Sequence, residues 1–307
     1  MYRLDLIRFL LPVLISVFTY HVKAQQQAMY TQYMFNQLAI NPAYAGIHEG
    51  ISANMLWREQ WVGFEGAPST QTFSVHSPIN FRPISLGIMF IHDKIGLTNQ
   101  NGINLDYAYR IRLGQSRLSF GLQASFNNFR TNYNLDGVLD PTLLTANVNV
   151  SRPNFGTGLM WHSDKFYLGL SVPQIVNQKM DPNNIASDAE LIRHYFLLGG
   201  YVFPVSSNVL LKPNFLFKAV PGAPAQIDVN LNVLLQDIVW VGVSYRQLES
   251  LSGLLQIQIT PQFQVGYSVD ILTDDYLRNV NSGTSHEIMI NYIIEMPQTK
   301  ILTPRYF

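Results

Sequence analysis

The stretch GINLDYAYRIRL, residues 102–113, decides the fold that we expect for this chain. From Ile103 to Leu113 every second residue is apolar, and the residues between them are charged, amide or small. Because successive side chains of a β-strand point to opposite faces, this alternation predicts a strand with one apolar and one polar face. Residues 225–236 and 262–271 repeat the pattern, so we expect a chain built mainly of long strands.

Segments of this kind recur from about residue 50 to residue 294. We count about 14 of them, near residues 50–62, 70–79, 84–92, 101–113, 116–128, 153–162, 165–173, 191–203, 208–218, 225–236, 238–246, 252–260, 262–272 and 285–294. Tight turns alternate with longer connections, which we expect at 63–69, 93–100, 129–152, 174–190, 219–224, 247–251 and 273–284. Short turns on one rim and long loops on the other are typical of a bacterial outer-membrane barrel. An even strand number suits such a barrel, and 12 or 16 strands remain alternatives to 14.

A large soluble β-sandwich would also alternate apolar and polar residues. The expected strands of about 9–13 residues have the length of tilted membrane strands, whereas sandwich strands centre near about 5–6 residues. Charges almost never fall on the apolar face, and aromatic residues lie near strand ends, as at Trp57, Trp61, Phe155, Trp161, Tyr195, Phe203 and Tyr292. We therefore predict an all-β, antiparallel transmembrane barrel, because a closed sheet pairs every backbone group inside a bilayer.

The composition agrees with a membrane barrel. Only 13% of the 307 residues are charged, and 20 basic residues balance 20 acidic ones. Asn and Gln together outnumber the charged residues, which suits a polar interior. The lack of a basic excess argues against nucleic-acid binding. The absence of cysteine excludes disulfides, thiol catalysis and cysteine-ligated zinc.

Residues 1–24 have the form of a secretory signal peptide. Arg3 and Arg8 precede an apolar run over residues 9–18, and short residues up to Ala24 fit a signal peptidase site. A membrane-spanning helix would need roughly 20 apolar residues, about twice the length of this run. We expect cleavage after Ala24, a periplasmic segment over 25–49, the barrel over 50–294 and a periplasmic tail over 295–307.

Residues 25–49 depart from the strand period. Tyr30, Tyr33, Met34 and Leu38 fall near helical spacing, and Asn41-Pro42 would end a helix. Two interpretations are open at this point. The segment is either an amphipathic cap on the periplasmic rim, or a plug or docking segment for a periplasmic partner.

Three blocks of sequence resemble the PorP/SprF family of outer-membrane proteins in the Bacteroidota type IX secretion system. They are YMFNQ at 33–37 with NPAYAG at 41–46, REQWVGF at 58–64 with GAP at 66–68, and SHEIM at 285–289. The last four residues, PRYF at 304–307, are also similar to family tails. The resemblance covers essentially the whole chain after residue 24, although the middle strands match in pattern only.

The resemblance implies a barrel that works with the type IX machinery on exported proteins. In the SprF-like branch, which serves gliding motility, the exported protein is a large adhesin whose C-terminal domain needs a partner barrel. The PorP-like branch is associated with periplasmic lipoproteins and a peptidoglycan-binding partner. The leading hypothesis is therefore a non-enzymatic secretion component that binds an exported protein. A passive channel or transporter for small solutes is the alternative.

Two sets of candidate site residues follow. The candidates for partner binding are Tyr33, Met34, Phe35, Asn36, Gln37, Asn41, Pro42, Tyr44, Gly46, Trp61, Tyr133 and Asp136. The candidates for a charge network inside the barrel lie on the polar face of their strands: Arg58, Asp106, Arg110, Arg112, Asp228, Arg246, Asp270 and Glu287. Such charges should pair or contact water, because unpaired buried charge is costly. Interior apolar residues such as Leu198, Leu216 and Trp240 favour a partly filled barrel over an open pore.

No catalytic motif is found. The sequence contains no zinc-protease, nucleophile-elbow, phosphate-loop or dinucleotide-binding signature. His162 and Asp164 could offer two metal ligands, but they lie at an expected tight turn. We expect no catalytic, cofactor or metal site.

Overall fold

The computed structural model describes residues 27–79, 82–131, 148–179, 190–273, 283–295 and Tyr306. The first half of the sheet is made by β1 (Gly50–Glu59), β2 (Ser69–Pro78), β3 (Ile84–Ile95), β4 (Thr98–Leu113), β5 (Ser116–Thr131), β6 (Val148–His162) and β7 (Phe166–Val172). The second half is made by β10 (Tyr195–Tyr201), β11 (Phe203–Ser206), β12 (Val209–Ala219), β13 (Gln226–Leu235), β14 (Val239–Arg246), β15 (Ser250–Gln258), β16 (Phe263–Leu272) and β17 (Ser285–Glu295). Two short strands of two residues each, β8 (Gln178–Lys179) and β9 (Glu190–Leu191), pair with each other in a separate sheet.

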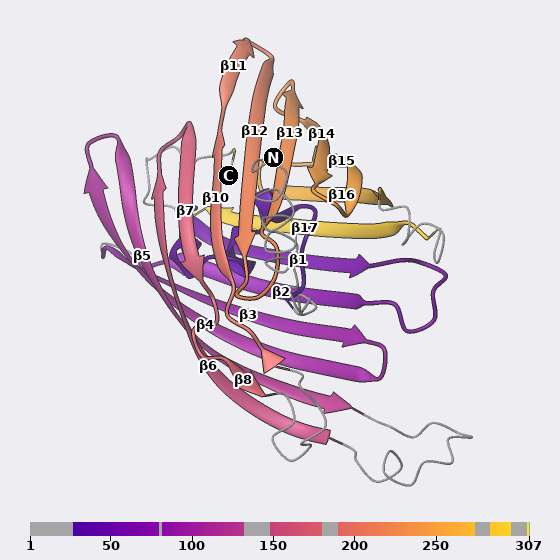
Figure 1. The fold of residues 1–307 in the computed structure, drawn as a ribbon. Helices are drawn as coiled ribbons and strands as arrows, with labels where there is room; N and C mark the ends of the chain where they lie inside the picture. Colours follow the sequence, from indigo (N-terminus) through magenta and orange to yellow (C-terminus); the bar gives the residue numbers. More distant parts are fainter. Residues whose placement is uncertain are drawn as a thin grey trace, which may run out of the picture.

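The strands form a closed antiparallel barrel of 14 strands. From β1 to β7 and from β12 to β17 each strand pairs with the next, and the barrel is closed by the pairs β7–β10, β10–β12 and β1–β17. Figure 1 shows the closure, where the indigo β1 lies beside the yellow β17. β11 continues beside β12 after a break at Val202, whose N–H donates to the carbonyl of Lys165. The predicted fold class is confirmed, and the segment expected at 191–203 is an interrupted strand.

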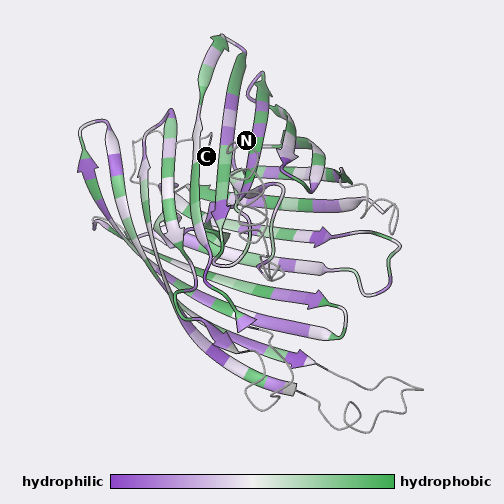
Figure 2. Cartoon of the chain, in the orientation of Figure 1, coloured by the Kyte–Doolittle hydropathy of each residue, from purple (hydrophilic) through white to green (hydrophobic). Residues whose placement is uncertain are grey.

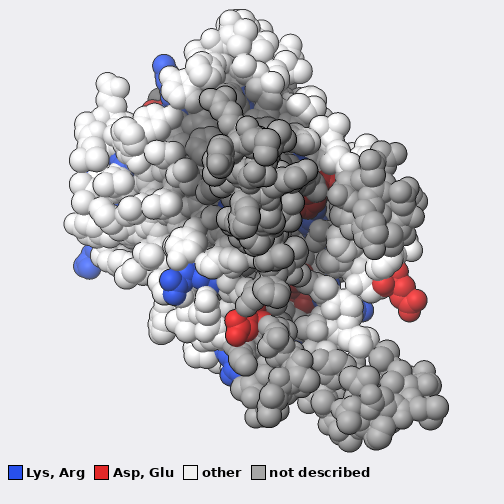
Figure 3. Space-filling model, viewed as in Figure 1, with Lys and Arg blue, Asp and Glu red and all other residues white. Residues whose placement is uncertain are grey.

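The two faces of the wall follow the alternation in the sequence. In β5, Ser119, Gln123 and Asn127 face inward and are buried, whereas Leu122 and Phe126 face outward and are exposed. Polar and apolar residues therefore alternate along the strands in Figure 2. In Figure 3 most of the visible wall carries no charge. An uncharged, apolar outer wall is what a barrel presents to lipid.

The two rims differ in the connections that they carry. On the rim where β1 begins and β17 ends, which we call the turn rim, the turns are short, as at Gly114-Gln115. The opposite rim, which we call the loop rim, carries the connections 60–68, 132–147, 173–194, 220–225 and 273–284.

Two loop-rim connections are tight turns where longer loops were predicted. β3 and β4 extend to Ile95 and Thr98, so only Gly96-Leu97 separates them where a loop over 93–100 was expected. Gly96 adopts a positive φ of 56°, which allows this tight turn. The connection expected at 247–251 is also a tight turn, over 247–249.

The helical elements of the described chain are three 3-10 turns: η1 (Tyr33–Phe35), η2 (Gln37–Ala39) and η3 (Pro42–Tyr44). No helix among the described residues is long and apolar enough to cross a membrane. Residues 1–24 lie outside the described chain, and the signal peptide remains a prediction.

Candidate functional site

Residues 27–49 lie inside the barrel, and we call this segment the plug. Every residue from Tyr30 to Glu49 is buried. The apolar core of the molecule lies between the plug and the inner wall, where Tyr33, Met34 and Leu38 pack with wall residues such as Trp240. Burying a large apolar side chain of this kind contributes about 1.5–3 kcal/mol, so the contact between plug and wall is a substantial part of the fold.

Asn41 fixes the middle of the plug to the wall. Its side-chain Oδ1 accepts a hydrogen bond from the N–H of Ala43 at 2.9 Å, which caps η3. Its Nδ2 donates to the carbonyl of Leu159 on β6 at 2.9 Å. Glycines make this approach possible, because a Cβ at Gly121 would overlap the backbone of Ala43. A Cβ at Gly158 would likewise overlap the side chain of Asn41.

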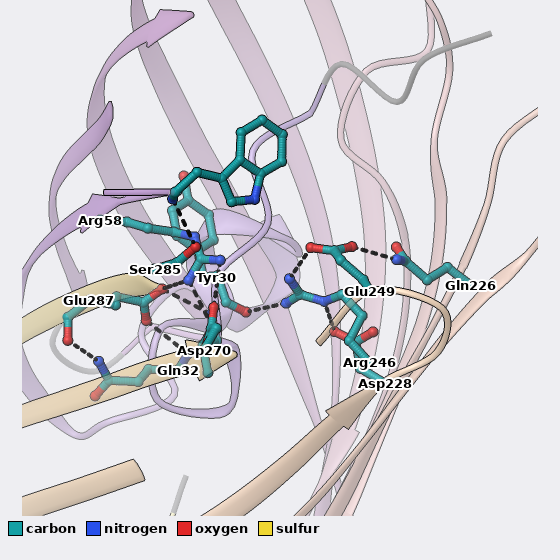
Figure 4. A network of polar contacts seen from close by, with 12 residues as sticks. Tyr30, Gln32, Arg58, Gln226, Asp228, Arg246, Glu249, Asp270, Ser285 and Glu287 are labelled. Atoms are coloured by element: carbon teal, nitrogen blue, oxygen red, sulfur yellow. Dashed lines mark hydrogen bonds and ion pairs between the residues drawn. The ribbon is translucent and has the colours of Figure 1, made fainter. Parts of the chain in front are cut away.

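A buried ion-pair cluster holds the start of the plug near the loop rim (Figure 4). The guanidinium of Arg58 contacts the carboxylates of Asp270 at 2.7 Å and Glu287 at 3.1 Å. Glu287 accepts hydrogen bonds from the backbone N–H groups of Thr31 at 2.9 Å and Gln32 at 2.8 Å. Arg58, Asp270 and Glu287 are each no more than 3% exposed. The plug backbone thus supplies part of the hydrogen bonding that these buried charges need.

A second cluster adjoins the first. Arg246 pairs with Asp228 at 2.8 Å and with Glu249 at 2.9 Å, and its third nitrogen donates to the carbonyl of Tyr30 at 3.3 Å. Gln226 donates to Glu249 at 2.7 Å. Although burial disfavours the charged carboxylate, the Arg246 guanidinium and these hydrogen bonds hold the pKa of Glu249 below its usual value. Arginines from two different strands therefore hold Thr31 and Tyr30 (Figure 4).

The other end of the plug is held at the turn rim. Arg117 forms an ion pair with Glu49. Arg110 donates to the backbone carbonyls of Ala45 and Gly46, and the N–H of Gly46 donates to Nδ1 of His76 at 3.0 Å. Since residues 31–32 contact the loop-rim ends of β16 and β17, the plug crosses the lumen from the loop rim to the turn rim.

Lys212 joins the plug, the wall and the C-terminal tail. Its ammonium is fully buried and lies 4.7 Å from the ring centre of Phe35 and 5.7 Å from that of Trp240. It also donates to the carbonyl of Tyr306. Tyr306, the described residue of the C-terminal tail, therefore contacts the inner wall of the barrel.

The predicted network residues do not form a single network. Arg58, Asp270 and Glu287 form the first cluster, and Arg246 with Asp228 forms the core of the second. Asp106 is buried and accepts a bond from Gln123 at 2.8 Å, away from both clusters. Arg110 contacts the plug backbone, whereas Arg112 is exposed near the turn rim and joins neither cluster.

The predicted partner-binding residues also lie in different parts of the molecule. Those of the plug are enclosed in the lumen: Tyr33, Met34, Phe35, Asn36, Gln37, Asn41, Pro42, Tyr44 and Gly46. Trp61 lies half-buried on the loop rim, where its backbone N–H donates to Ser285 at 3.2 Å. Tyr133 and Asp136 lie outside the described residues. His162 is buried, and the described residues contain no group of three His, Asp or Glu side chains suited to a metal.

Sequence reasoning missed five residues of the site. Thr31 and Gln32 are polar residues in a segment read for its apolar spacing, and Glu249 lies in an expected loop. Val62 and Phe64 flank the tip of the β1–β2 loop and are 50% and 46% exposed. The signal that could have identified Val62 and Phe64 in the sequence is the presence of apolar side chains in a connection between strands.

Comparison with known proteins identifies the family of this chain. Residues 22–292 match the family described as "Type IX secretion system membrane protein PorP/SprF". No curated protein matches the sequence significantly. Among solved structures, the chain is similar to the outer membrane protein Omp33 of Acinetobacter baumannii, with 9% identity, a TM-score of 0.48, and 81% of this chain and 100% of that chain covered. It is also similar to the toluene transporter TbuX of Ralstonia pickettii, with 9% identity, a TM-score of 0.49, and 89% and 95% covered. The family match spans most of the sequence and includes both the plug and the barrel, so this chain belongs to the PorP/SprF family of type IX secretion system membrane proteins.

Proposed function

We propose that this outer-membrane barrel is a non-enzymatic scaffold that binds an exported protein at its loop rim and connects it to periplasmic machinery at its turn rim. The filled lumen carries this proposal. The plug is buried from Tyr30 to Glu49, is held by ion pairs near both rims and occupies the lumen. A barrel of this kind acts through its rims rather than through its interior.

The β1–β2 loop is the strongest candidate surface for the exported protein. Val62 and Phe64 expose apolar side chains, and the loop backbone is fixed by hydrogen bonds. The N–H of Val62 donates to the carbonyl of Thr284, and the N–H of Gly96 donates to the carbonyl of Gly66, each at 2.9 Å. Exposed apolar groups on a preorganised loop suit a protein interface, because little conformational entropy is lost on binding.

The plug candidates take a different role in this proposal. Tyr33, Asn41 and their neighbours are enclosed, so they hold the plug instead of contacting a partner directly. A periplasmic lipoprotein or peptidoglycan-binding partner would meet the turn rim, where the described tail residue Tyr306 also lies against the lumen. The exported protein is expected to be large and adhesin-like if the chain serves the gliding-associated branch.

Affinity purification from gently solubilised outer membranes tests the proposal. We expect an exported protein and type IX lipoproteins to co-purify with the barrel. The pair of substitutions Val62→Ser and Phe64→Ser should weaken binding of the exported protein about thirtyfold and reduce its recovery accordingly, since two apolar anchors of about 1 kcal/mol each would be lost. Leu248→Asn, which removes an exposed apolar side chain from a different loop-rim turn, is the matched control and should leave recovery unchanged.

A barrel that remains solitary even after cross-linking would contradict the scaffold proposal. If deletion of the gene then altered solute uptake without a secretion defect, the passive channel would replace it. Equal losses from both sets of variants would show that the β1–β2 loop has no special part in binding.

A further inference from the structure

A small cavity lies at the loop-rim end of the lumen, between the start of the plug and β3, β4 and β5. Its volume is about 50 Å³. A water molecule needs about 10–15 Å³ by this measure, so the cavity has room for about four waters. Its lining is made by Gln27, Ala28, Tyr30, Ala39, Ile91, Asp93, Gln100, Asn104, Gln123, Pro173, Gln174, Leu191, Ile192 and His194.

The polar lining of this cavity offers hydrogen-bond acceptors. Asp93 is 5% exposed, and its carboxylate accepts a bond from the hydroxyl of Thr70 at 2.5 Å. Oε1 of Gln27 is buried without a hydrogen-bond partner, and so is Nε2 of His194, whose side chain is 1% exposed. Nδ1 of His194 must carry a proton, because it donates to the carbonyl of Ile192 at 2.7 Å. Burial lowers the pKa of His194, so the ring is neutral and Nε2 is an acceptor.

Among the described residues the carboxylate of Asp93 has no ion-pair partner, and the cation that acts on His194 is the buried Lys218 of β12. The cavity lining itself contains no Lys or Arg. Behind the lining residue Gln123, Asp106 is also buried, and one of its carboxylate oxygens has no hydrogen-bond partner. The paired arginines Arg58 and Arg246 belong to β1 and β14, where they are held by other carboxylates. A buried carboxylate without a cation is costly unless it takes up a proton, and a positively charged ligand would stabilise the charged form.

The apolar lining narrows the choice of ligand. Ile91, Pro173 and Leu191 give the cavity an apolar side next to its acceptors. A bare metal ion would gain nothing from those side chains, and the described residues contain no group of three metal-ligating side chains. A lysine side chain combines an aliphatic stem with an ammonium that donates three hydrogen bonds. Its stem and ammonium are also comparable in size with the cavity.

We propose that this cavity binds the ammonium of a lysine side chain, with the aliphatic stem against the apolar lining and the charge at Asp93. The inference rests on the proposed function for its biological source, a lysine on the exported protein that approaches the loop rim. The chemistry itself does not depend on that source and can be measured with a small ligand.

The test is a calorimetric titration. Nα-acetyl-lysine amide is added to the purified full-length barrel in detergent, and the heat of binding is measured. Nα-acetyl-norleucine amide, which has the stem without the ammonium, is the comparison ligand. We expect saturable binding of the lysine compound alone. Asp93→Asn should weaken it about tenfold or more, as loss of a hydrogen bond to a charged group predicts. Glu65→Gln, which neutralises an exposed carboxylate on the β1–β2 loop, should leave binding unchanged.

Gln27→Leu gives a second variant if Asp93→Asn does not fold, and it should also weaken binding of the lysine compound. Equal binding of the two compounds would overturn the inference. So would the absence of binding to the unsubstituted protein, or unchanged affinity in both cavity variants. Because the ligand is a small molecule, these outcomes are separate from loss of the exported protein in the purification experiment.

Discussion

Replacing Arg58 by methionine should destabilise the folded barrel by about 3–5 kcal/mol, the range found when one partner of a buried ion pair is removed. The substitution leaves the carboxylates of Asp270 and Glu287 buried without their arginine. It also removes the hydrogen bond from Arg58 to Thr31, so the start of the plug loses a contact as well. Urea unfolding of the barrel in detergent measures the loss of stability. The folded fraction is read from the shift of folded protein on unheated gels.

Two further variants separate the causes of this effect. Arg112→Met makes the same substitution at an exposed arginine and should change stability by less than about 0.5 kcal/mol. Combining Arg58→Met with Asp270→Asn and Glu287→Gln should restore part of the lost stability, because the uncompensated charges are gone. An Arg58→Met barrel as stable as the Arg112→Met barrel would show that the cluster does not hold the fold.

Gly121→Ala should displace the plug while the barrel wall stays intact. A methyl group at this position would overlap the backbone of Ala43, and backbone cannot move aside as the end of a flexible side chain can. We expect a cost of about 3 kcal/mol, at the upper end of the range for overpacking a filled core. The chain has no cysteine, so Ala39→Cys in the plug can report exposure through its rate of labelling by a maleimide.

The matched control is Gly253→Ala, where an added methyl group meets only ordinary van der Waals contact. Labelling at position 39 should be slow in the parent and in the Gly253→Ala variant, and fast in the Gly121→Ala variant. Slow labelling in all three would mean that the plug does not depend on its close approach to β5.

The barrel could be predicted from sequence because its signal is local and repeated. Alternation such as that of residues 102–113 depends only on neighbouring residues, and it sets which face of each strand is buried. The break at Val202 was not visible, since it coincides with a long-range hydrogen bond to Lys165 in the turn between β6 and β7. The tight turn at Gly96 was missed because the residues beside it are polar and predict a loop. Residues such as Gln100 instead belong to the strands and extend them to the loop rim.

The site was predictable only in part. Alternation along a strand identified Arg58, Asp270 and Glu287 as inward-facing, but it does not give the register that brings them together on the neighbouring strands β1, β16 and β17. Residues 25–49 left two interpretations open. Their apolar residues fall near helical spacing, whereas the segment forms three separate 3-10 turns. What places it inside is a set of long-range contacts, such as Asn41 with Leu159 and Thr31 with Glu287. No pattern in the segment itself contains that information.

The central claim is that the barrel works with a filled lumen, and planar-bilayer conductance tests it most directly. Purified protein inserted into the bilayer should show no steady open-pore current, whereas a variant lacking residues 27–46 should conduct if its barrel assembles. Stable conductance steps from the unaltered protein would contradict the account and would favour a channel for small solutes.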